Sequence, residues 1–334
     1  MSRQYVKKIW LLALMFSVLV FIVGAVVFGK LGSKNITLSY SSTPSVNVSP
    51  KSLGEANMLF VGDIMLSRSV GDIMATKNDY LWPFRQIADF LKGADLTFAN
   101  LETPVSNKGT NVGSIYSFRS NPKSIDGLTY AGFDLVSIAN NHAWDYGRDA
   151  FVDTMGNLSS AGISYIGGGH NEIEAHAGVI KKVGDTNVGF LAYTNLLSKS
   201  LSASGDKAGI TILDETRMMQ DIKLMKSHVS LVVVSFHWGE EYHLIHNALQ
   251  ERIAHKAIDA GADLIIGHHP HVVEDIEQYK GKYIVYSLGN FIFDQNFSAE
   301  TMTGLAVRVW LKNKAIDRIE QIPIHISKEY QASL

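Results

Sequence analysis

The fold is decided by the stretch LIIGHHPH at residues 264–271, in which an apolar run leads directly into three histidines. A short, continuous apolar run that is rich in isoleucine predicts a buried strand. Three imidazoles crowded at the end of such a strand would repel one another at mildly acidic pH. We therefore interpret His268, His269 and His271 as candidate metal ligands rather than as core residues.

The same pattern of an apolar run followed by polar side chains recurs along the chain. It predicts further strands at Met58–Val61, Leu96–Ala99, Leu135–Ala139, Val188–Tyr193, Leu231–Phe236 and Tyr283–Leu288. Between the strands it predicts helices at Pro83–Leu91, Pro122–Ala131, Asp149–Ala161, Asp214–Lys226 and Asn247–Ala260. This alternation indicates an α/β domain with a largely parallel sheet covered by helices. The segment Thr303–Ile326, with a turn at Asn313 and Lys314, predicts an antiparallel hairpin that closes the domain.

Polar groups that suit a metal follow these strands, and ligands gather at the carboxyl ends of strands in open α/β sheets. They are Asp63, Glu102, Asn141 with His142, His237, and the histidines at 268, 269 and 271. Taken singly, Asp63 could cap the following segment, Asn141 could serve a turn and His237 could be a core histidine. Together, carboxylates, an amide and imidazoles predict a two-metal site that activates water, and His142 is placed to protonate a leaving group.

Composition excludes several classes of function. The 334 residues are 46% hydrophobic and 19% charged, so the chain can bury a large core. The formal net charge is −2, and we therefore predict that nucleic acid is not a partner. The chain has no cysteine, which excludes disulfides, thiolate ligands and a lipid-modified cysteine. Neither a G-x-S-x-G motif nor a Walker-type loop occurs, which argues against a serine hydrolase and a nucleotide-binding protein.

The N-terminal region predicts a membrane anchor. Residues 9–28 contain no charge and match the roughly 20 residues that a helix needs to cross a bilayer. Basic residues before this run favour a cytoplasmic N-terminus at residues 1–8, and the polar composition of residues 29–56 is typical of a flexible stalk. A cleaved signal peptide is the alternative, although its apolar region is usually shorter. The folded domain would then span residues 57–330, outside the cytoplasm.

Six blocks of the sequence resemble the CapA-type poly-gamma-glutamate capsule synthesis proteins. They are GDIM at 62–65, NLETP at 100–104, ANNH at 139–142 with DYG at 145–147, HWGEEY at 237–242, GAD at 261–263 with GHHPHV at 267–272, and YSLGNF at 286–291. That family is similar to the calcineurin-like metallophosphoesterases. The similarity implies a sandwich of two mixed sheets flanked by helices, with one or two divalent ions of the Mn, Fe or Zn type.

The resemblance also implies a role for each candidate residue. The ligands would be Asp63 for the first metal, Glu102 as the bridge, Asn141 and His237 for the second metal, and His269 with His271 as the closing pair; His142 would be the acid. One position departs from the superfamily, which normally has His two positions after the first Asp. Here that position is Met65, whose thioether suits a hard cation poorly. His268 could supply the missing nitrogen, or the protein could bind one metal or none.

The family resemblance implies a process, the synthesis or export of a poly-gamma-glutamate-type polymer together with membrane synthetase subunits. Such a polymer is polyanionic, and Arg68 and Asn290 are candidate substrate-binding residues. We expect Arg68, Arg119 and Arg148 to lie in loops beside the site. One hypothesis is a metal-dependent hydrolase acting on a phosphoester, or on an amide or ester bond of a surface polymer. The other is a noncatalytic binding or scaffold module that has kept the fold and lost the chemistry.

Overall fold

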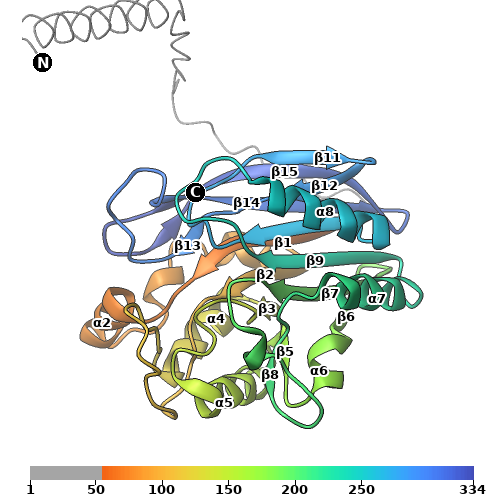
Figure 1. Cartoon of the computed structure of the whole chain (residues 1–334). Helices are drawn as coiled ribbons and strands as arrows, with labels where there is room; N and C mark the ends of the chain where they lie inside the picture. Colours follow the sequence, from red (N-terminus) through yellow and green to blue (C-terminus); the bar gives the residue numbers. More distant parts are fainter. Residues whose placement is uncertain (1–54) are drawn as a thin grey trace, which may run out of the picture. The chain divides into compact units, whose positions relative to one another are not determined.

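The computed structural model describes residues 55–334 (Figure 1). The predicted cytoplasmic tail, the anchor and all but the last two residues of the predicted stalk lie outside the described residues. Within residues 55–334, no helix combines the length and the apolar character that a membrane crossing requires.

The first of two mixed sheets contains the strand that carries Asp63. Its strand order is β16-β15-β14-β1-β2-β3-β4, and β13 also pairs with β1. The strands β1 to β4 run parallel, whereas β14 runs antiparallel to both β1 and β15. Their bounds are β1 (Ala56–Ile64), β2 (Leu96–Leu101), β3 (Leu135–Ser137), β4 (Ser164–Ile166), β13 (Asn290–Ile292), β14 (Thr303–Lys312), β15 (Ala315–Ile326) and β16 (Ala332–Ser333). The predicted closing hairpin is therefore confirmed as β14 and β15.

The second sheet has the order β11-β12-β10-β9-β7-β6. Its four inner strands are parallel, and antiparallel strands form its two edges. Their bounds are β6 (Val179–Val183), β7 (Thr186–Thr194), β9 (Leu231–His237), β10 (Leu264–His268), β11 (Ile276–Tyr279) and β12 (Lys282–Val285); a small separate sheet joins β5 (Gly168–Gly169) to β8 (Gly209–Ile210). The prediction of an α/β fold is confirmed, with its strands divided between two principal sheets.

Helices follow most of the parallel strands. They are α2 (Arg68–Lys77), α3 (Ala88–Lys92), α4 (Ile125–Ala131), α5 (Gly147–Ser160), α6 (Glu172–Ala177), α7 (Glu215–Lys226) and α8 (Ala248–Ala260), with 3-10 turns η1 (Trp82–Phe84), η2 (Pro122–Ser124) and η3 (Lys199–Leu201). The single helix predicted at residues 83–91 is wrong, because turns closed by Phe84 and Ile87 keep the apolar spacing without a continuous helix. The loop position expected for Arg68 and Arg148 is also wrong, since these residues belong to α2 and α5.

Two apolar cores explain why the strands read as continuous apolar runs. On β9, Val233 belongs to the core that joins the two sheets, whereas Val232 and Val234 belong to a second core formed with α7 and α8. Figure 1 shows these two helices beside the second sheet. Both faces of β9 are therefore covered, which removes the alternation of polar and apolar residues seen in half-exposed strands.

Candidate metal centre

Strand pairing brings the predicted ligands to one end of both sheets. Asp63 on β1 is in register with Asn100 on β2 and with Asn290 on β13. In the second sheet, His237 on β9 is in register with His268 on β10. Because these strand pairs are parallel, their carboxyl ends meet at the same edge. The arrangement follows from the topology and not from proximity in the sequence.

Glu102 lies at the middle of this cluster. Its side chain is fully buried, and Oε1 has no hydrogen-bond partner. The Nε2 atoms of three histidines surround that oxygen, at 3.7 Å for His271 and 3.9 Å for both His142 and His237. These distances are too long for hydrogen bonds. Two ligand atoms that each lie about 2.1 Å from one ion are separated by ~3.4 Å at a tetrahedral angle, and by more at wider angles.

Two groups of possible ligands share Glu102. One contains Glu102, His269 and His271, and the other contains Asp63, Glu102 and His237; within each group the candidate ligand atoms lie within 4.8 Å of one another. All five residues are buried. A carboxylate common to two adjacent groups has the position that a bridging ligand requires, and the donor set of carboxylates and imidazoles suits a divalent transition metal.

The charge states of these groups also suit a cation. Burial lowers the pKa of His269 to about 3. Burial, and the repulsion that His269 and His237 would exert on each other if both were protonated, hold the pKa of His237 well below its ordinary value. Both imidazoles are therefore neutral, as ligands must be. Burial opposes ionisation of Asp63, but His268 and other neighbouring histidines outweigh it and hold the pKa of Asp63 low. Burial and the charge of Asp63 raise the pKa of Glu102, so this group ionises readily only beside a positive charge.

Asn100 connects the two sheets and was not predicted to be a site residue. Its Nδ2 donates to Asp63 Oδ1 at 2.8 Å and lies 3.3 Å from Glu102 Oε2 and 3.2 Å from His237 Nδ1. Asn140 fixes this amide by donating to Asn100 Oδ1 at 3.1 Å. The available signal was a polar residue directly after the predicted buried strand Leu96–Ala99, because a polar group buried there must find partners.

The other predicted second-metal ligand also joins the cluster. Asn141 Oδ1 lies 2.7 Å from His237 Nε2, so the amide oxygen and the imidazole face the same space. His142 follows in the chain and is held differently. Its Nδ1 lies 2.7 Å from Asp145 Oδ2, and its ring stacks on Phe118 with centroids 3.8 Å apart. The stacking partner was not predicted, since no periodicity marks Phe118 in its long loop.

Met65 and His268 are the two residues on which the first metal site depends. Met65 is fully buried, and its sulfur accepts hydrogen bonds from the amide and the hydroxyl of Ser67. His268 is also fully buried, with Nδ1 3.2 Å from Asp63 Oδ1, yet neither ring nitrogen makes a hydrogen bond in the described part of the chain. A buried imidazole that lies beside a carboxylate and has no hydrogen-bond partner is suited to bind a cation. The role of His268 as a substitute ligand stays a prediction.

The two candidate substrate-binding residues are held by other side chains. Asn290 is fully buried, and its Oδ1 lies 3.0 Å from His271 Nδ1, which suits it to orient that imidazole. Arg68 is partly exposed and pairs with Asp294 through Nε at 3.1 Å and Nη2 at 2.9 Å. Their contact with a substrate stays a prediction. Arg119 and Arg148 lie over aromatic rings, next to the loop that carries His142.

Left-handed backbone is concentrated at this centre. Among residues 55–334, nine residues other than glycine have positive φ, and four of them border the centre. They are Arg68 at 50°, Tyr242 at 65°, His269 at 101° and His271 at 58°. Residues with side chains rarely adopt such angles, so the surrounding structure must hold them. This strain helps to fix the directions in which the two histidines point.

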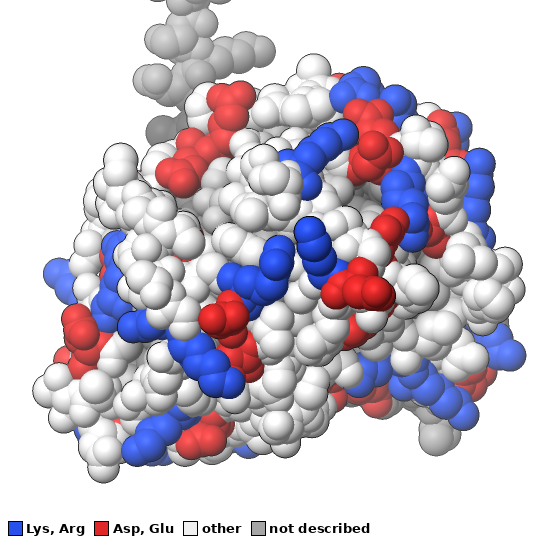
Figure 2. Space-filling view, turned by 60° about the horizontal axis from the view of Figure 1, so that its bottom comes forward, with Lys and Arg blue, Asp and Glu red and all other residues white. Residues whose placement is uncertain are grey.

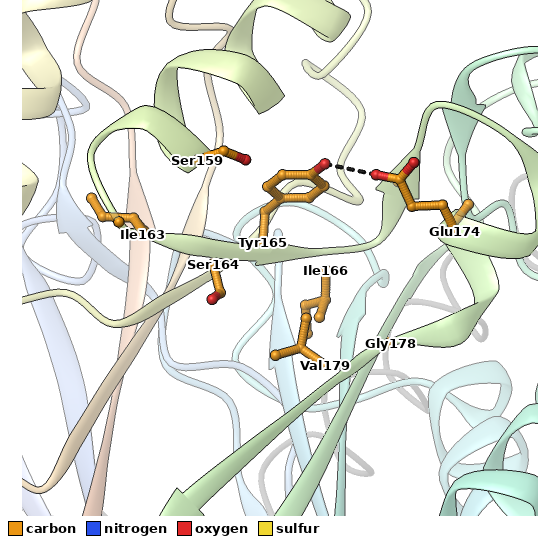
Figure 3. A pocket seen from close by; sticks show the side chains of 11 residues that line it. Ser159, Ile163, Ser164, Tyr165, Ile166, Glu174, Gly178 and Val179 are labelled. Carbon is orange, nitrogen blue, oxygen red and sulfur yellow. Dashed lines mark hydrogen bonds between the residues drawn. The ribbon is translucent and has the colours of Figure 1, made fainter.

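A separate cavity of about 410 Å3 opens beside β4 and α6 (Figure 3). Tyr165 donates a hydrogen bond of 2.8 Å to Glu174 at its edge, and His170 occupies the other side of that carboxylate. None of the predicted site residues lines this cavity. Its acidic group is already paired, so we place the candidate site at the buried cluster around Glu102.

Comparisons with known proteins agree with the sequence blocks that converge here. The chain is 34% identical over 271 residues to the PGA biosynthesis protein CapA of Bacillus subtilis (strain 168), covering 80% of this chain and 70% of that protein. It is 31% identical over 280 residues to the capsule biosynthesis protein CapA of Bacillus anthracis, covering 81% and 67%. A hypothetical protein from Thermus thermophilus shares the fold, with a TM-score of 0.51 at 18% identity, over 80% of this chain and 98% of that one.

The match to a family profile covers most of the chain. The family described as bacterial capsule synthesis protein PGA_cap matches residues 57–295, which include every residue of the candidate metal centre. Together with the two CapA relatives, this match shows that the chain is a member of the bacterial capsule synthesis protein family PGA_cap.

Proposed function

We propose that this chain is a membrane-anchored, extracytoplasmic factor in the synthesis or export of a poly-gamma-glutamate-type polymer, and that it carries a metal-dependent hydrolase site of the calcineurin-like phosphoesterase type. The process is supported by the names of the CapA relatives, and the anchor by the apolar run at residues 9–28. The hydrolase site rests on one observation above all. The buried Oε1 of Glu102 lacks a hydrogen-bond partner, and imidazole nitrogens surround it at the distances expected between two ligands of one metal ion.

In this proposal six side chains hold one or two divalent cations. They are Asp63, Glu102, Asn141, His237, His269 and His271. His268, beside Asp63, is a substitute nitrogen ligand in this proposal. Such cations would supply Lewis acidity that activates water and neutralises the negative charge developing during hydrolysis. Asn100 keeps Asp63, Glu102 and His237 in their relative positions through the contacts of its amide.

His142 is the proposed proton donor. Asp145 accepts a hydrogen bond from Phe118 N at 2.7 Å and lies 2.7 Å from His142 Nδ1, so it fixes the orientation of the ring. Nε2 then points toward the centre, 3.9 Å from Glu102 Oε1. The imidazolium gives its Nε2 proton to the leaving oxygen or nitrogen as the scissile bond breaks. His142 is 8% exposed, so it keeps a small contact with solvent.

The charges on one face of the domain give no continuous basic track along which a polyanion could bind. Figure 2 shows acidic and basic residues interspersed on the face it presents, with neither sign dominating. Beside the centre, the guanidinium of Arg68 is paired with Asp294 but is 38% exposed. Such an arrangement suits a local grip on one carboxylate or phosphate group.

Metal content tests the site. Elemental analysis of the purified chain should give up to two equivalents of a transition metal, and His237→Ala or His269→Ala should lose it with an unchanged circular dichroism spectrum. His170→Ala is the matched control, because that histidine is half exposed and pairs with Glu174, which lines the separate cavity. Hydrolysis of bis-p-nitrophenyl phosphate and of a poly-gamma-glutamate oligomer should fall in the same two variants. No bound metal in the parent chain would refute the hydrolase site.

The noncatalytic scaffold is the second candidate, and the buried, locally bonded Met65 favours it. The two are separated in cells that lack the gene. A scaffold would restore surface polymer when supplied as the Asn141→Ala variant, whereas a hydrolase would not. Deletion of the gene without any change in surface polymer would exclude the capsule role in both forms.

A further inference from the structure

Exposed apolar side chains gather beside the metal centre, and we call the surface that they border the mouth of the centre. Of the twelve large apolar side chains exposed among residues 55–334, eight belong to three segments. We call these segments the collar: Val112, Ile115 and Tyr116 in residues 112–116; Tyr242, Leu244, Ile245 and Leu249 in residues 242–249; and Phe297. Scattered apolar residues are ordinary on a protein surface, but a cluster around one opening indicates a surface that meets something apolar.

Contacts place the collar at the centre itself. The Tyr242 ring lies 5.1 Å from the Phe297 ring and 6.3 Å from the ring of His271. Tyr116 lies 6.0 Å from the guanidinium of Arg68, which also lies 5.2 Å from the ring of Phe118. The Phe118 ring is 5.8 Å from Phe293, and Phe293 is 4.6 Å from His271. A series of ring contacts therefore links Tyr116 to Tyr242 past the proposed ligand His271.

The collar carries no formal charge. Residues 112–116, residues 242–249 and Phe297 include no Asp, Glu, Lys or Arg. Their side chains protrude strongly, with Ile115 92%, Ile245 71% and Phe297 64% exposed. A polyanion would be bound by cations, which the collar lacks. Aliphatic and aromatic tips without charge are instead typical of segments that enter the interfacial layer of a lipid bilayer.

A bilayer is within reach of the collar if the chain is anchored. The 27 residues 29–55 separate the apolar run from β1 and could extend over at most ~90 Å. The strand β1 has nine residues, or about 30 Å, between its start and the end that carries Asp63. The connecting length therefore exceeds the distance along the domain by a wide margin, so an anchored domain is free to turn its mouth to the membrane.

We propose that the collar inserts into the interfacial layer of the membrane, so that the metal centre opens onto the lipid surface. This inference rests on the proposed membrane anchoring. The mouth would then receive its substrate where a polymer leaves the membrane or from a group carried at the lipid surface.

The absence of cysteine permits a direct test on the full chain. Single variants Ile115→Cys, Ile245→Cys and Phe297→Cys are labelled with an environment-sensitive fluorophore and reconstituted into vesicles of phosphatidylcholine and phosphatidylglycerol. Ile173→Cys on α6 and Leu224→Cys on α7 are matched controls, with 82% and 64% exposure outside the collar. We expect a blue shift and quenching by lipid-borne quenchers at the three collar positions, and neither effect at the two controls.

The outcomes separate this inference from the proposal on which it rests. If the chain floats with the vesicles while its collar labels stay in water, the anchor is retained and the inference is overturned. A collar that binds a protein partner instead of lipid would give this result. A chain that does not float overturns both. A blue shift that appears without lipid and grows with protein concentration would assign the collar to contact between copies, and would also overturn the inference.

Discussion

Replacing Glu102 by glutamine tests two properties of this carboxylate separately: the energetic cost of burying it, and its role in binding a metal ion. Without a cation, Oε1 is buried without a hydrogen-bond partner, and Asp63 adds a second negative charge nearby. Because burial and Asp63 raise the pKa of Glu102, its ionised form destabilises the folded state at neutral pH. We expect Glu102→Gln to raise the free energy of unfolding of the metal-free chain by about 1–3 kcal/mol, because the neutral amide removes the desolvation penalty of the buried charge and its repulsion from Asp63.

The same change should abolish stabilisation by metal. An ion present at about 100 times its Kd adds ~2.7 kcal/mol to the free energy of unfolding. In urea titrations, the parent chain should gain about that amount when Mn2+ is added, and Glu102→Gln should gain none. Tryptophan fluorescence reports on the domain, because four of the five tryptophans lie within residues 55–334.

The control for this experiment is Glu251→Gln, an exposed position in the first turn of α8. It should lower the free energy of unfolding by no more than about 1 kcal/mol and leave the Mn2+ effect unchanged. A Glu102→Gln chain that is less stable than the parent without metal would refute the reasoning about the unpaired carboxylate. Full retention of the Mn2+ effect would refute its role as the shared ligand.

Three further changes test the supports of the site. Asn290→Ala frees His271 Nδ1 and should weaken Mn2+ binding about 10–100-fold in calorimetry while the circular dichroism spectrum is kept. Burial raises the pKa of Glu274 to about 7, so the folded chain holds this proton more tightly than the unfolded chain; the resulting stability is present below pH 4.5 and is lost as the pH rises through 7. Glu274→Gln should therefore raise the free energy of unfolding in guanidinium titrations at pH 8, by at most about 3 kcal/mol, and leave it unchanged at pH 4. Gly267→Ala would place a Cβ 1.8 Å from the Tyr286 carbonyl oxygen, and we expect a loss of more than ~4 kcal/mol in thermal unfolding or no folded protein.

The sequence predicted the cluster because strand ends follow from periodicity. Asp63, Glu102 and His237 each come at or just after the end of an apolar run, and parallel pairing carries such ends to one edge. The class of fold and the closing hairpin were predictable for the same reason. The helix predicted at residues 83–91 was wrong because apolar spacing alone does not distinguish an α-helix from successive 3-10 turns.

Contacts between distant segments could not be predicted in this way. Phe118 stacks on His142 because its loop is tied to Asp145 by a backbone hydrogen bond, and no local pattern encodes that path. The pairing of Arg68 with Asp294 joins residues 226 positions apart. Asn100 was visible as a polar residue directly after a predicted buried strand, but its three contacts depend on the packing of one sheet against the other.

The left-handed angles of His269 and His271 have an evolutionary consequence. Glycine would adopt those angles without strain, whereas a residue with a side chain costs about 1–3 kcal/mol at each position. A lineage that no longer needed the centre could therefore exchange either histidine for glycine and relieve that strain. Imidazoles kept at both positions in divergent descendants would mark a centre that is still in use, and glycines there would mark a relic.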